Sequence, residues 1–234
     1  MKNNKKILCV IPARGGSKGI PLKNIQKIMG KTLIKITADC VKKINLIDKC
    51  ILSTDNQDIA NEAIACGIEV PFMRPSNISG DRISDFQVLE HALLAMEKID
   101  KKEYDYILML QPTSPLRSYK DVISCLNKII DENWDAVWTV SKNDSKNHPL
   151  KQLKIDGYDS LSLYDKAGEN IIARQELNPL FYRNGVAYVM TRNCLLNQKK
   201  ILGLKTAGFI VNSYQISIDT PLDLELAEFF LKKK

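Results

Sequence analysis

The sequence predicts an α/β fold in which an open, mainly parallel sheet carries helices on both faces. Short apolar runs, of the length of buried strands, alternate with longer stretches in which apolar residues recur at helical spacing. A glycine-rich segment directly follows the first apolar run, which is the usual place for a ligand-binding loop in such sheets. The 234 residues, 44% apolar and 26% charged, suffice for one large domain with a small accessory lobe. Together these features favour a Rossmann-like domain.

The first half of the chain contains a regular alternation of strands and helices. Ile7–Ile11 is a continuous apolar run, as expected of a strand that is buried on both faces. Asn56 can cap a helix whose end is marked by Gly67, and Ser84 can cap the next one. The elements expected here are a strand at 7–11, a helix at 33–44, a strand at 50–53, a helix at 57–66, a short strand at 70–73 and a helix at 84–96.

The second half continues the alternation but contains an interruption. From Lys142 to about Arg183 the chain is polar, and two glycine-containing turn signals predict one or two hairpins. We therefore divide the chain into an α/β domain, residues 1–141 and 184–234, and an inserted arm, residues 142–183, that packs on a partner subunit. The remaining expected elements are strands at 106–110, 136–140 and 186–190, a helix at 118–130, apolar runs at 209–211 and 214–218, and a final helix from Pro221 to Phe230.

Composition and charge exclude several classes of protein. The formal net charge is +7, but no segment interleaves lysines with aromatic residues, so an anionic small molecule is favoured over nucleic acid. No apolar run approaches the ~18 residues of a membrane span, and Arg14 interrupts the first run too soon for a signal peptide. The six scattered cysteines form no Cys-x-x-Cys pair, which favours free thiols in a reducing, cytoplasmic compartment.

The strongest local motif is the glycine-rich loop after the first strand, Pro12–Gly19. Its glycines let the backbone turn tightly and bring N–H groups close to oxyanions. Arg14, Lys18 and Lys23 add positive charge, and an arginine can hold a phosphate with two hydrogen bonds. The spacing is neither that of a Walker A motif nor Gly-x-Gly-x-x-Gly. A surface turn with solvated lysines is the alternative, but the position favours binding of a triphosphate.

Further motifs follow this loop in a fixed order along nearly the whole chain. They are Ser53-Thr54-Asp55, Arg74-Pro75, Asp81 with Ser84, His91-Ala92-Leu93, Leu110–Arg117, His148–Lys151, Arg174-Gln175, Arg183-Asn184-Gly185 and Ile218-Asp219-Thr220. These motifs, in this order, resemble those of the acylneuraminate cytidylyltransferase family, the CMP-sialic acid (CMP-nonulosonic acid) synthetases. The resemblance implies that CTP and a nine-carbon 2-keto sugar acid give the CMP-sugar and pyrophosphate. The anomeric hydroxyl would attack the α-phosphorus in line, with Mg²⁺ or another divalent cation bridging the phosphates.

The resemblance implies roles for the residues that bind the nucleotide. Arg14 and Lys23 would hold the triphosphate, and Asn24 would contact the ribose. Arg74 and Ser84 match positions that bind the cytosine, although Ser84 equally suits a helix cap. The loop residues that would support the triphosphate are Ala13, Gly15, Ser17 and Lys18.

The resemblance also implies roles on the side of the sugar acid. Gln111 lies at the end of a strand and would face the sugar. Arg174 and Arg183 match basic residues that meet the sugar carboxylate, one of them supplied across the interface of a homodimer. The alternative for both arginines is a solvated charge in a polar insertion. Arg117 is expected to be structural, and the resemblance assigns His148 no role.

The expected metal ligand is Asp219, because the related motif Asp-x-Asp-Thr places carboxylates near the cation. Here Ser217 occupies the first position, and residues two apart on a strand share a face. The metal would then be bound by Asp219, and water would supply more of its ligands than in a site with two carboxylates. The alternative for Asp219 is a cap on the final helix.

Two other functions compete with this one. An enzyme for the eight-carbon acid Kdo would carry an acidic residue in the segment Gln111–Ser114, which this chain lacks. A catalytically inactive nucleotide-binding homologue is favoured only by Ser217. Neuraminic, legionaminic and pseudaminic acids all stay open as the nine-carbon substrate, because they differ in small substituents.

Overall fold

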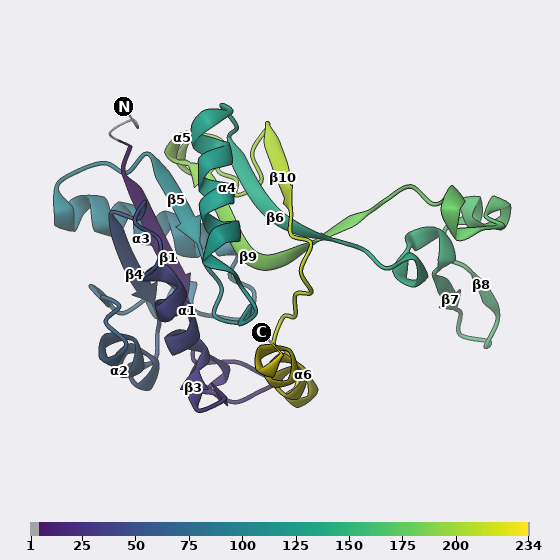
Figure 1. Ribbon diagram of the computed structural model, residues 1–234, viewed down its shortest axis with the longest axis horizontal. Helices are drawn as coiled ribbons and strands as arrows, with labels where there is room; N and C mark the ends of the chain where they lie inside the picture. The colour runs from purple at the N-terminus through teal and green to yellow at the C-terminus, as the bar shows by residue number, and fades with distance from the viewer. Residues whose placement is uncertain (1–4, 234) are drawn as a thin grey trace.

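The computed structural model describes residues 5–233, and its centre is a six-stranded sheet (Figure 1). The strands are β1 (Ile7–Pro12), β4 (Lys49–Ser53), β5 (Tyr106–Met109), β6 (Ala136–Lys142), β9 (Phe181–Thr191) and β10 (Thr206–Ile210). Their spatial order is β10-β6-β9-β5-β1-β4. β1 pairs in parallel with β4 and β5, and β10 with β6, whereas β9 runs antiparallel between β5 and β6. The expected open, mainly parallel sheet is thus confirmed.

Helices cover both faces of this sheet, as expected for a strand such as β1 that is apolar throughout. Ile7, Cys9 and Ile11 of β1 pack in one buried cluster with α1, α2 and α4. Leu8 and Val10 point to the other face and pack with α3 and α5. The helices are α1 (Leu33–Val41), α2 (Gln57–Ala65), α3 (Asp85–Asp100), α4 (Tyr119–Asp131) and α5 (Arg192–Leu196).

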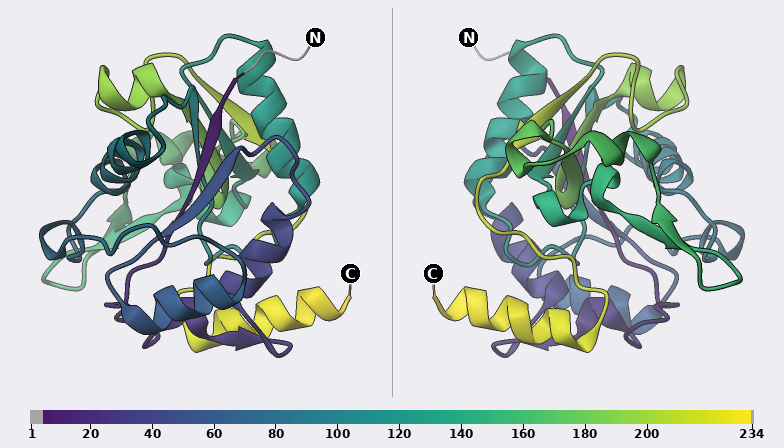
Figure 2. Two further views of the ribbon diagram at one scale, coloured as in Figure 1. Left: turned by 90° about the vertical axis from the view of Figure 1, so that its left-hand side faces the viewer. Right: turned by 90° about the vertical axis from the view of Figure 1, so that its right-hand side faces the viewer.

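A third buried cluster holds the last helix, α6 (Pro221–Lys232), beneath the ends of the strands (Figure 2). The chain reaches α6 through an extended segment, residues 211–220, that leaves β10 at the edge of the sheet. The backbone N–H of Ile218 donates to the carbonyl oxygen of Thr113, just after β5, at 2.9 Å. This hydrogen bond fixes the segment against the central strands and brings Asp219 next to them.

The predicted helix caps are present and explain where the helices begin. The Asn56 side chain accepts a hydrogen bond from the N–H of Ile59, at 3.1 Å, at the start of α2. Ser84 and Gln87 form a reciprocal capping box at the start of α3. At α6 the capping box is formed by Thr220 and Asp223, so Asp219 is not the cap.

Some expectations about single elements were wrong. Residues 70–73 form no strand; only isolated parallel bridges join Glu69 and Met73 to the neighbourhood of β4, because Pro71 has no N–H to donate. The first helix ends at Val41, before Ile44. The run at 214–218 is extended but does not pair with a neighbouring strand. The hairpin of β2 (Lys27–Ile28) and β3 (Lys31–Thr32), and the short α5, were not expected.

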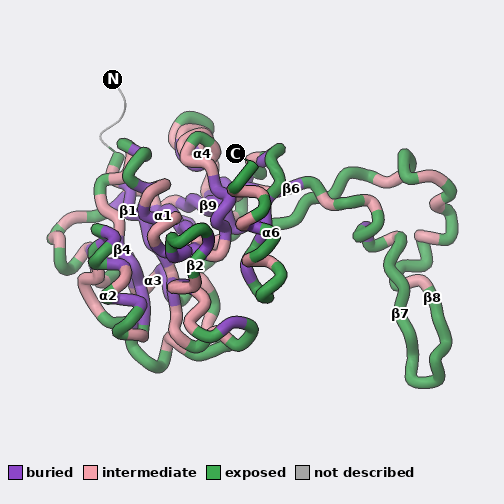
Figure 3. Tube along the Cα trace, turned by 60° about the horizontal axis from the view of Figure 1, so that its bottom comes forward, coloured by how far each residue is buried: buried purple, intermediate pink, exposed green. Residues whose placement is uncertain are grey.

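The insertion projects from the sheet as an arm (Figure 1). β6 and β9 stay paired up to Lys142 and Phe181, and the N–H of Asn143 donates to the carbonyl of Leu180. Beyond this point residues 143–180 form short 3₁₀ turns and the expected hairpin, β7 (Leu153–Ile155) with β8 (Leu161–Leu163). Figure 3 shows the arm as mostly exposed. Within residues 5–233 there is no helix with the length and apolarity needed to cross a membrane.

Candidate active site

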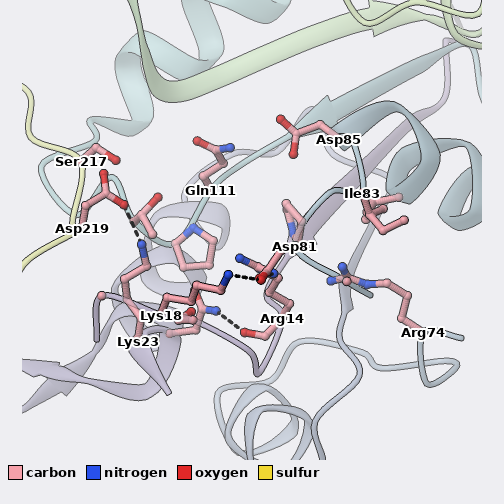
Figure 4. Close-up of a pocket in the computed structure, with 18 residues that line it drawn as sticks. Arg14, Lys18, Lys23, Arg74, Asp81, Ile83, Asp85, Gln111, Ser217 and Asp219 are labelled. Atoms are coloured by element: carbon pink, nitrogen blue, oxygen red, sulfur yellow. Dashed lines mark hydrogen bonds and ion pairs between the residues drawn. The ribbon is translucent and has the colours of Figure 1, made fainter. Parts of the chain in front are cut away.

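A cavity of about 500 Å³ opens where β1, β4 and β5 end (Figure 4). This is the edge at which open parallel sheets bind ligands, because the connecting loops diverge there. The residues that line the cavity come from the glycine-rich loop, from the segment before α3, from the end of β5 and from the segment before α6. Among them are Arg14, Ser17, Lys18, Lys23, Asn24, Arg74, Asp81, Asp85, Gln111, Ser217 and Asp219.

The glycine-rich loop is held from behind by α2 and β4. The N–H of Ala13 donates to Ser53 and the N–H of Gly15 donates to the Asp55 carboxylate, at 3.0 and 2.9 Å. A Cβ on Gly15 would lie 2.8 Å from the Cβ of Asn56, so a side chain here would push the loop away from α2. Ala13 and Gly15 therefore set the position of the loop without lining the cavity.

The cations in the loop and just after it are paired with carboxylates of the cavity. Arg14 and Lys18 both contact Asp81, at 2.5 and 2.6 Å, and Lys23 contacts Asp219 at 2.8 Å. Hydrogen bonds from Lys18 and Arg14 lower the pKa of Asp81, so its carboxyl is ionised at neutral pH. Three positive side chains thus face one space, and a bound triphosphate would compete with Asp81 and Asp219 for them.

Arg74 lies at another side of the cavity and is fixed by the end of β4. Its guanidinium donates to the Ser53 hydroxyl and to the Ser53 carbonyl, at 3.1 and 2.5 Å, and burial lowers its pKa. Asn24 is also buried and donates to the Arg14 carbonyl at 3.1 Å. Gln111 follows β5 and lines the cavity.

The possible metal ligands are Asp219 and Ser217, both on the cavity wall. The Asp219 side chain is 70% exposed. Within residues 5–233 no three His, Cys, Asp or Glu side chains lie close enough to hold a metal by themselves. Mg²⁺ often takes only one or two carboxylates and completes its shell with water and phosphate oxygens. The donors therefore fit a Mg²⁺ ion that is held jointly with a nucleotide.

Besides Ala13 and Gly15, three of the residues expected in the site lie outside this cavity. The Ser84 side chain caps α3 and pairs with Gln87, which is the alternative that the sequence left open. Arg183 is exposed on β9, at the root of the arm. Arg174 lies in the arm, where it lines a separate cavity of about 460 Å³ together with Lys142 and His148.

Two acidic residues of the cavity were missed by sequence reasoning. Asp81 follows Gly80 in a polar turn. It belongs to the motifs that carry the resemblance, but the resemblance implies no role for it. The sequence feature that could have indicated a role for Asp81 is an acidic residue within a short turn that precedes a capped helix. Asp85 gave no signal at all, because an aspartate in the first turn of a helix is common for electrostatic reasons.

Known proteins resemble this chain over nearly its whole length. The family model described as "Cytidylyltransferase" matches residues 8–233. The chain is 32% identical to "Post-translational flagellin modification protein B" of Campylobacter coli, over 98% of this chain and 96% of that protein. It is 28% identical to the CMP-N,N'-diacetyllegionaminic acid synthase of Legionella pneumophila, over 95% of each chain. It is also 28% identical to the pseudaminic acid cytidylyltransferase of Campylobacter jejuni, over 97% of each chain.

A solved structure shares the fold. The CMP:2-keto-3-deoxy-manno-octonic acid synthetase complexed with CTP superposes with a TM-score of 0.72, covering 98% of this chain and 99% of that one. At 19% identity this likeness establishes the Rossmann-like α/β fold alone. The match of the family model over nearly the whole chain settles the relationship, and the protein belongs to the cytidylyltransferase family.

Proposed function

We propose that this protein transfers CMP from CTP to the anomeric hydroxyl of a nonulosonic, sialic-type sugar acid and releases pyrophosphate. The observation that carries the proposal is the convergence of Arg14, Lys18 and Lys23 on one cavity at the ends of the parallel strands. Relatives that match this chain over nearly its whole length are named as synthases or cytidylyltransferases of legionaminic and pseudaminic acids. The proposed substrates are therefore CTP and an acid of this nine-carbon class.

The geometry supports a reaction that depends on positioning and on charge. The three cations would bind the triphosphate and, by neutralising it, lower the repulsion felt by an incoming nucleophile. Arg74 and Asn24, which are buried and held by protein carbonyls, would fix the nucleoside. In-line transfer of this kind needs no covalent intermediate, because orientation of the two substrates supplies much of the rate enhancement.

We also propose Mg²⁺, or another divalent cation, as the cofactor. Asp219 would hold it, with the Ser217 hydroxyl close by and phosphate oxygens completing the shell. Bound there, the ion would supply charge neutralisation at the phosphates of CTP. The chain's own contribution is to keep Asp219 beside the loop: a Cβ on Gly19 would lie 2.3 Å from the Asp219 carbonyl, so the two segments touch.

The proposed function is tested by measuring pyrophosphate release from CTP with a panel of sugar acids. The panel holds neuraminic, legionaminic and pseudaminic acids and Kdo, and UTP replaces CTP in a parallel series. We expect turnover with CTP and at least one nine-carbon acid. Turnover only with Kdo would show that the acceptor is an eight-carbon acid and not a nine-carbon one. Nucleotide binding without turnover of any acid would favour the inactive homologue.

The Asp219→Asn substitution should weaken the apparent affinity for Mg²⁺ by at least about tenfold, because the only carboxylate proposed as a ligand is lost. The measurement is the Mg²⁺ concentration that gives half the maximal rate at saturating CTP. Ser217→Asp should shift this concentration in the opposite direction, since it adds a second carboxylate on the same wall. Asp58→Asn, an exposed position on α2, serves as the control. An unchanged Mg²⁺ dependence in Asp219→Asn would remove Asp219 as the ligand.

We further propose that the protein is a cytoplasmic homodimer built on the arm. All six cysteines are free thiols, which suits a reducing compartment. The arm exposes apolar side chains that a second copy would bury, namely Leu153, Ile155, Leu161, Tyr164 and Ile172. Arg174 lies in the arm and outside the cavity of its own chain, so it would serve the site of the partner subunit.

This arrangement predicts complementation between two inactive variants. A dimer of Arg14→Ala with Arg174→Ala would contain one site with both arginines intact. Random exchange of subunits should therefore restore about a quarter of the wild-type activity, because half of the dimers are mixed and half of their sites are complete. The measurement is the activity after mixing, with exchange followed by fluorescence transfer between labelled subunits. Proven exchange without recovery, or a monomer in light scattering, would exclude the shared site.

A further inference from the structure

Asp85 is a carboxylate of the cavity that has no hydrogen-bond or ion-pair partner among the described residues, 5–233. It is the first residue of α3, and its side chain lines the cavity with Arg74 and Gln111. Within residues 5–233 its carboxylate accepts no side-chain hydrogen bond and forms no ion pair; Arg183 and Arg74 act on it only through space. In this it differs from Asp81 and Asp219, both of which contact cations.

A role in stabilising the helix does not account for this position. An aspartate in the first turn of a helix interacts favourably with the helix dipole, and this interaction does not require the carboxylate to be buried. Asp58 of α2 has that place and is exposed. Asp85 is instead half-buried, and burial raises the pKa of its carboxyl although Arg183 and Arg74 oppose the shift. A carboxylate that loses hydration without gaining a hydrogen bond is destabilising, unless a ligand supplies the donor.

The charges of the cavity indicate which ligand groups could reach Asp85. Figure 4 shows Lys18 and Lys23 on one side of the cavity and Asp85 with Gln111 on the other. Phosphate oxygens would be attracted to the lysines and repelled by Asp85, so the triphosphate belongs on the lysine side. The group that meets Asp85 must carry hydrogen-bond donors. Hydroxyl and amide N–H groups have this property, and both are abundant on an N-acylated sugar acid.

The residues around Asp85 favour the sugar acid over the cytosine as the group that contacts it. The cation with the larger effect on its pKa is Arg183, which lies on β9 where the strand leaves for the arm. Gln111 follows β5, the strand paired with β9. Arg74, the residue suited to the base, is turned toward Ser53 at the end of β4 by its hydrogen bonds.

We propose that Asp85, next to Gln111, accepts hydrogen bonds from hydroxyl or amide N–H groups of the sugar acid and so sets its orientation. This inference rests on the proposed function and makes Asp85 a specificity-determining residue of the sugar side. It also predicts that the sugar's own carboxylate lies away from Asp85, because two carboxylates repel each other.

The test compares Asp85→Asn with the wild-type protein in two separate measurements. The asparagine keeps the size and removes the charge, so we expect the KM for the sugar acid to rise about 10- to 100-fold while the KM for CTP changes less than about threefold. Asp85→Glu, which keeps the charge but moves it, should show a smaller rise. Glu90→Gln lies on the same helix outside the cavity and should leave both constants unchanged.

Binding of the sugar acid to protein saturated with a non-hydrolysable CTP analogue is measured by calorimetry, which needs no turnover. Weaker binding to Asp85→Asn, with equal binding of the analogue, supports the inference. Equal binding of the sugar acid to both proteins overturns it and leaves the proposed function intact. Weaker binding of the analogue would also overturn it, since Asp85 would then face the nucleotide. If the wild-type protein binds none of the sugar acids, the proposed function itself is refuted, and the role inferred for Asp85 is refuted with it.

Discussion

Replacement of Arg117 by methionine should lower the free energy of unfolding by about 3–5 kcal/mol. The residue is only 9% exposed, and its guanidinium donates to the backbone carbonyls of Val186 and Gln111 at 2.5 Å and of Gly185 at 3.1 Å. Methionine fills much of the same volume but donates nothing, so three carbonyls would lose a charged donor inside the protein. The expected structural role of Arg117 follows from these contacts: it joins the segment just after β5 to the middle of β9.

Urea denaturation followed by circular dichroism measures this change. Arg82→Met is the matched control, because Arg82 is exposed and no cavity or buried contact involves it. The control should unfold at the wild-type urea concentration. An Arg117→Met protein that unfolds at the same concentration as the control would show that water replaces the lost donor.

The Lys23→Ala substitution should reduce kcat/KM for CTP by about 10- to 100-fold, because a charged phosphate contact contributes roughly 1.5–3 kcal/mol. The Lys23 side chain is 16% exposed and is held at 2.8 Å from Asp219, so its ammonium group is fixed at the cavity before any ligand binds. A fixed charge loses little conformational entropy when a phosphate arrives. We expect the KM for the sugar acid to stay close to its wild-type value.

Steady-state kinetics at varied CTP and fixed sugar acid separate the two effects. Lys27→Ala serves as the control, since Lys27 is an exposed lysine on β2, outside the cavity. Arg14→Ala should resemble Lys23→Ala, because Arg14 faces the same space. Wild-type values for CTP in both variants would mean that the triphosphate is bound elsewhere.

The sheet and its helices were predictable from the sequence because local patterns coincide with the packing. A strand such as β1 is apolar at every position, and each of its two faces meets helices. The segment at 70–73 has a similar composition, yet it forms only isolated bridges beside β4. Whether a short apolar run becomes a strand depends on a partner with free N–H and carbonyl groups, and the run itself does not contain that information.

The site was predictable where a residue lies directly at the end of a strand. Arg14 and Gln111 follow β1 and β5, and both line the cavity. Ser84 was placed in the site by resemblance, but its hydroxyl caps α3. Asp85, one residue further, enters the cavity instead. One residue along a helix turns a side chain by about 100°, so the first turn of α3 decides which of the two faces the cavity, and only coordinates give that direction.

The antiparallel course of β9 has a consequence for how this protein can be altered. Because β9 returns beside β6, everything between Lys142 and Phe181 leaves and re-enters the sheet at a single point. The pairing of the strands does not depend on the length of the excursion. An arm taken from a relative could be grafted at this point while the nucleotide-binding part keeps its register. In such chimaeras the loop around Arg14, together with Gln111 and Asp85, would stay unchanged, and only the arm's own contribution, through residues such as Arg174, would be exchanged as a module.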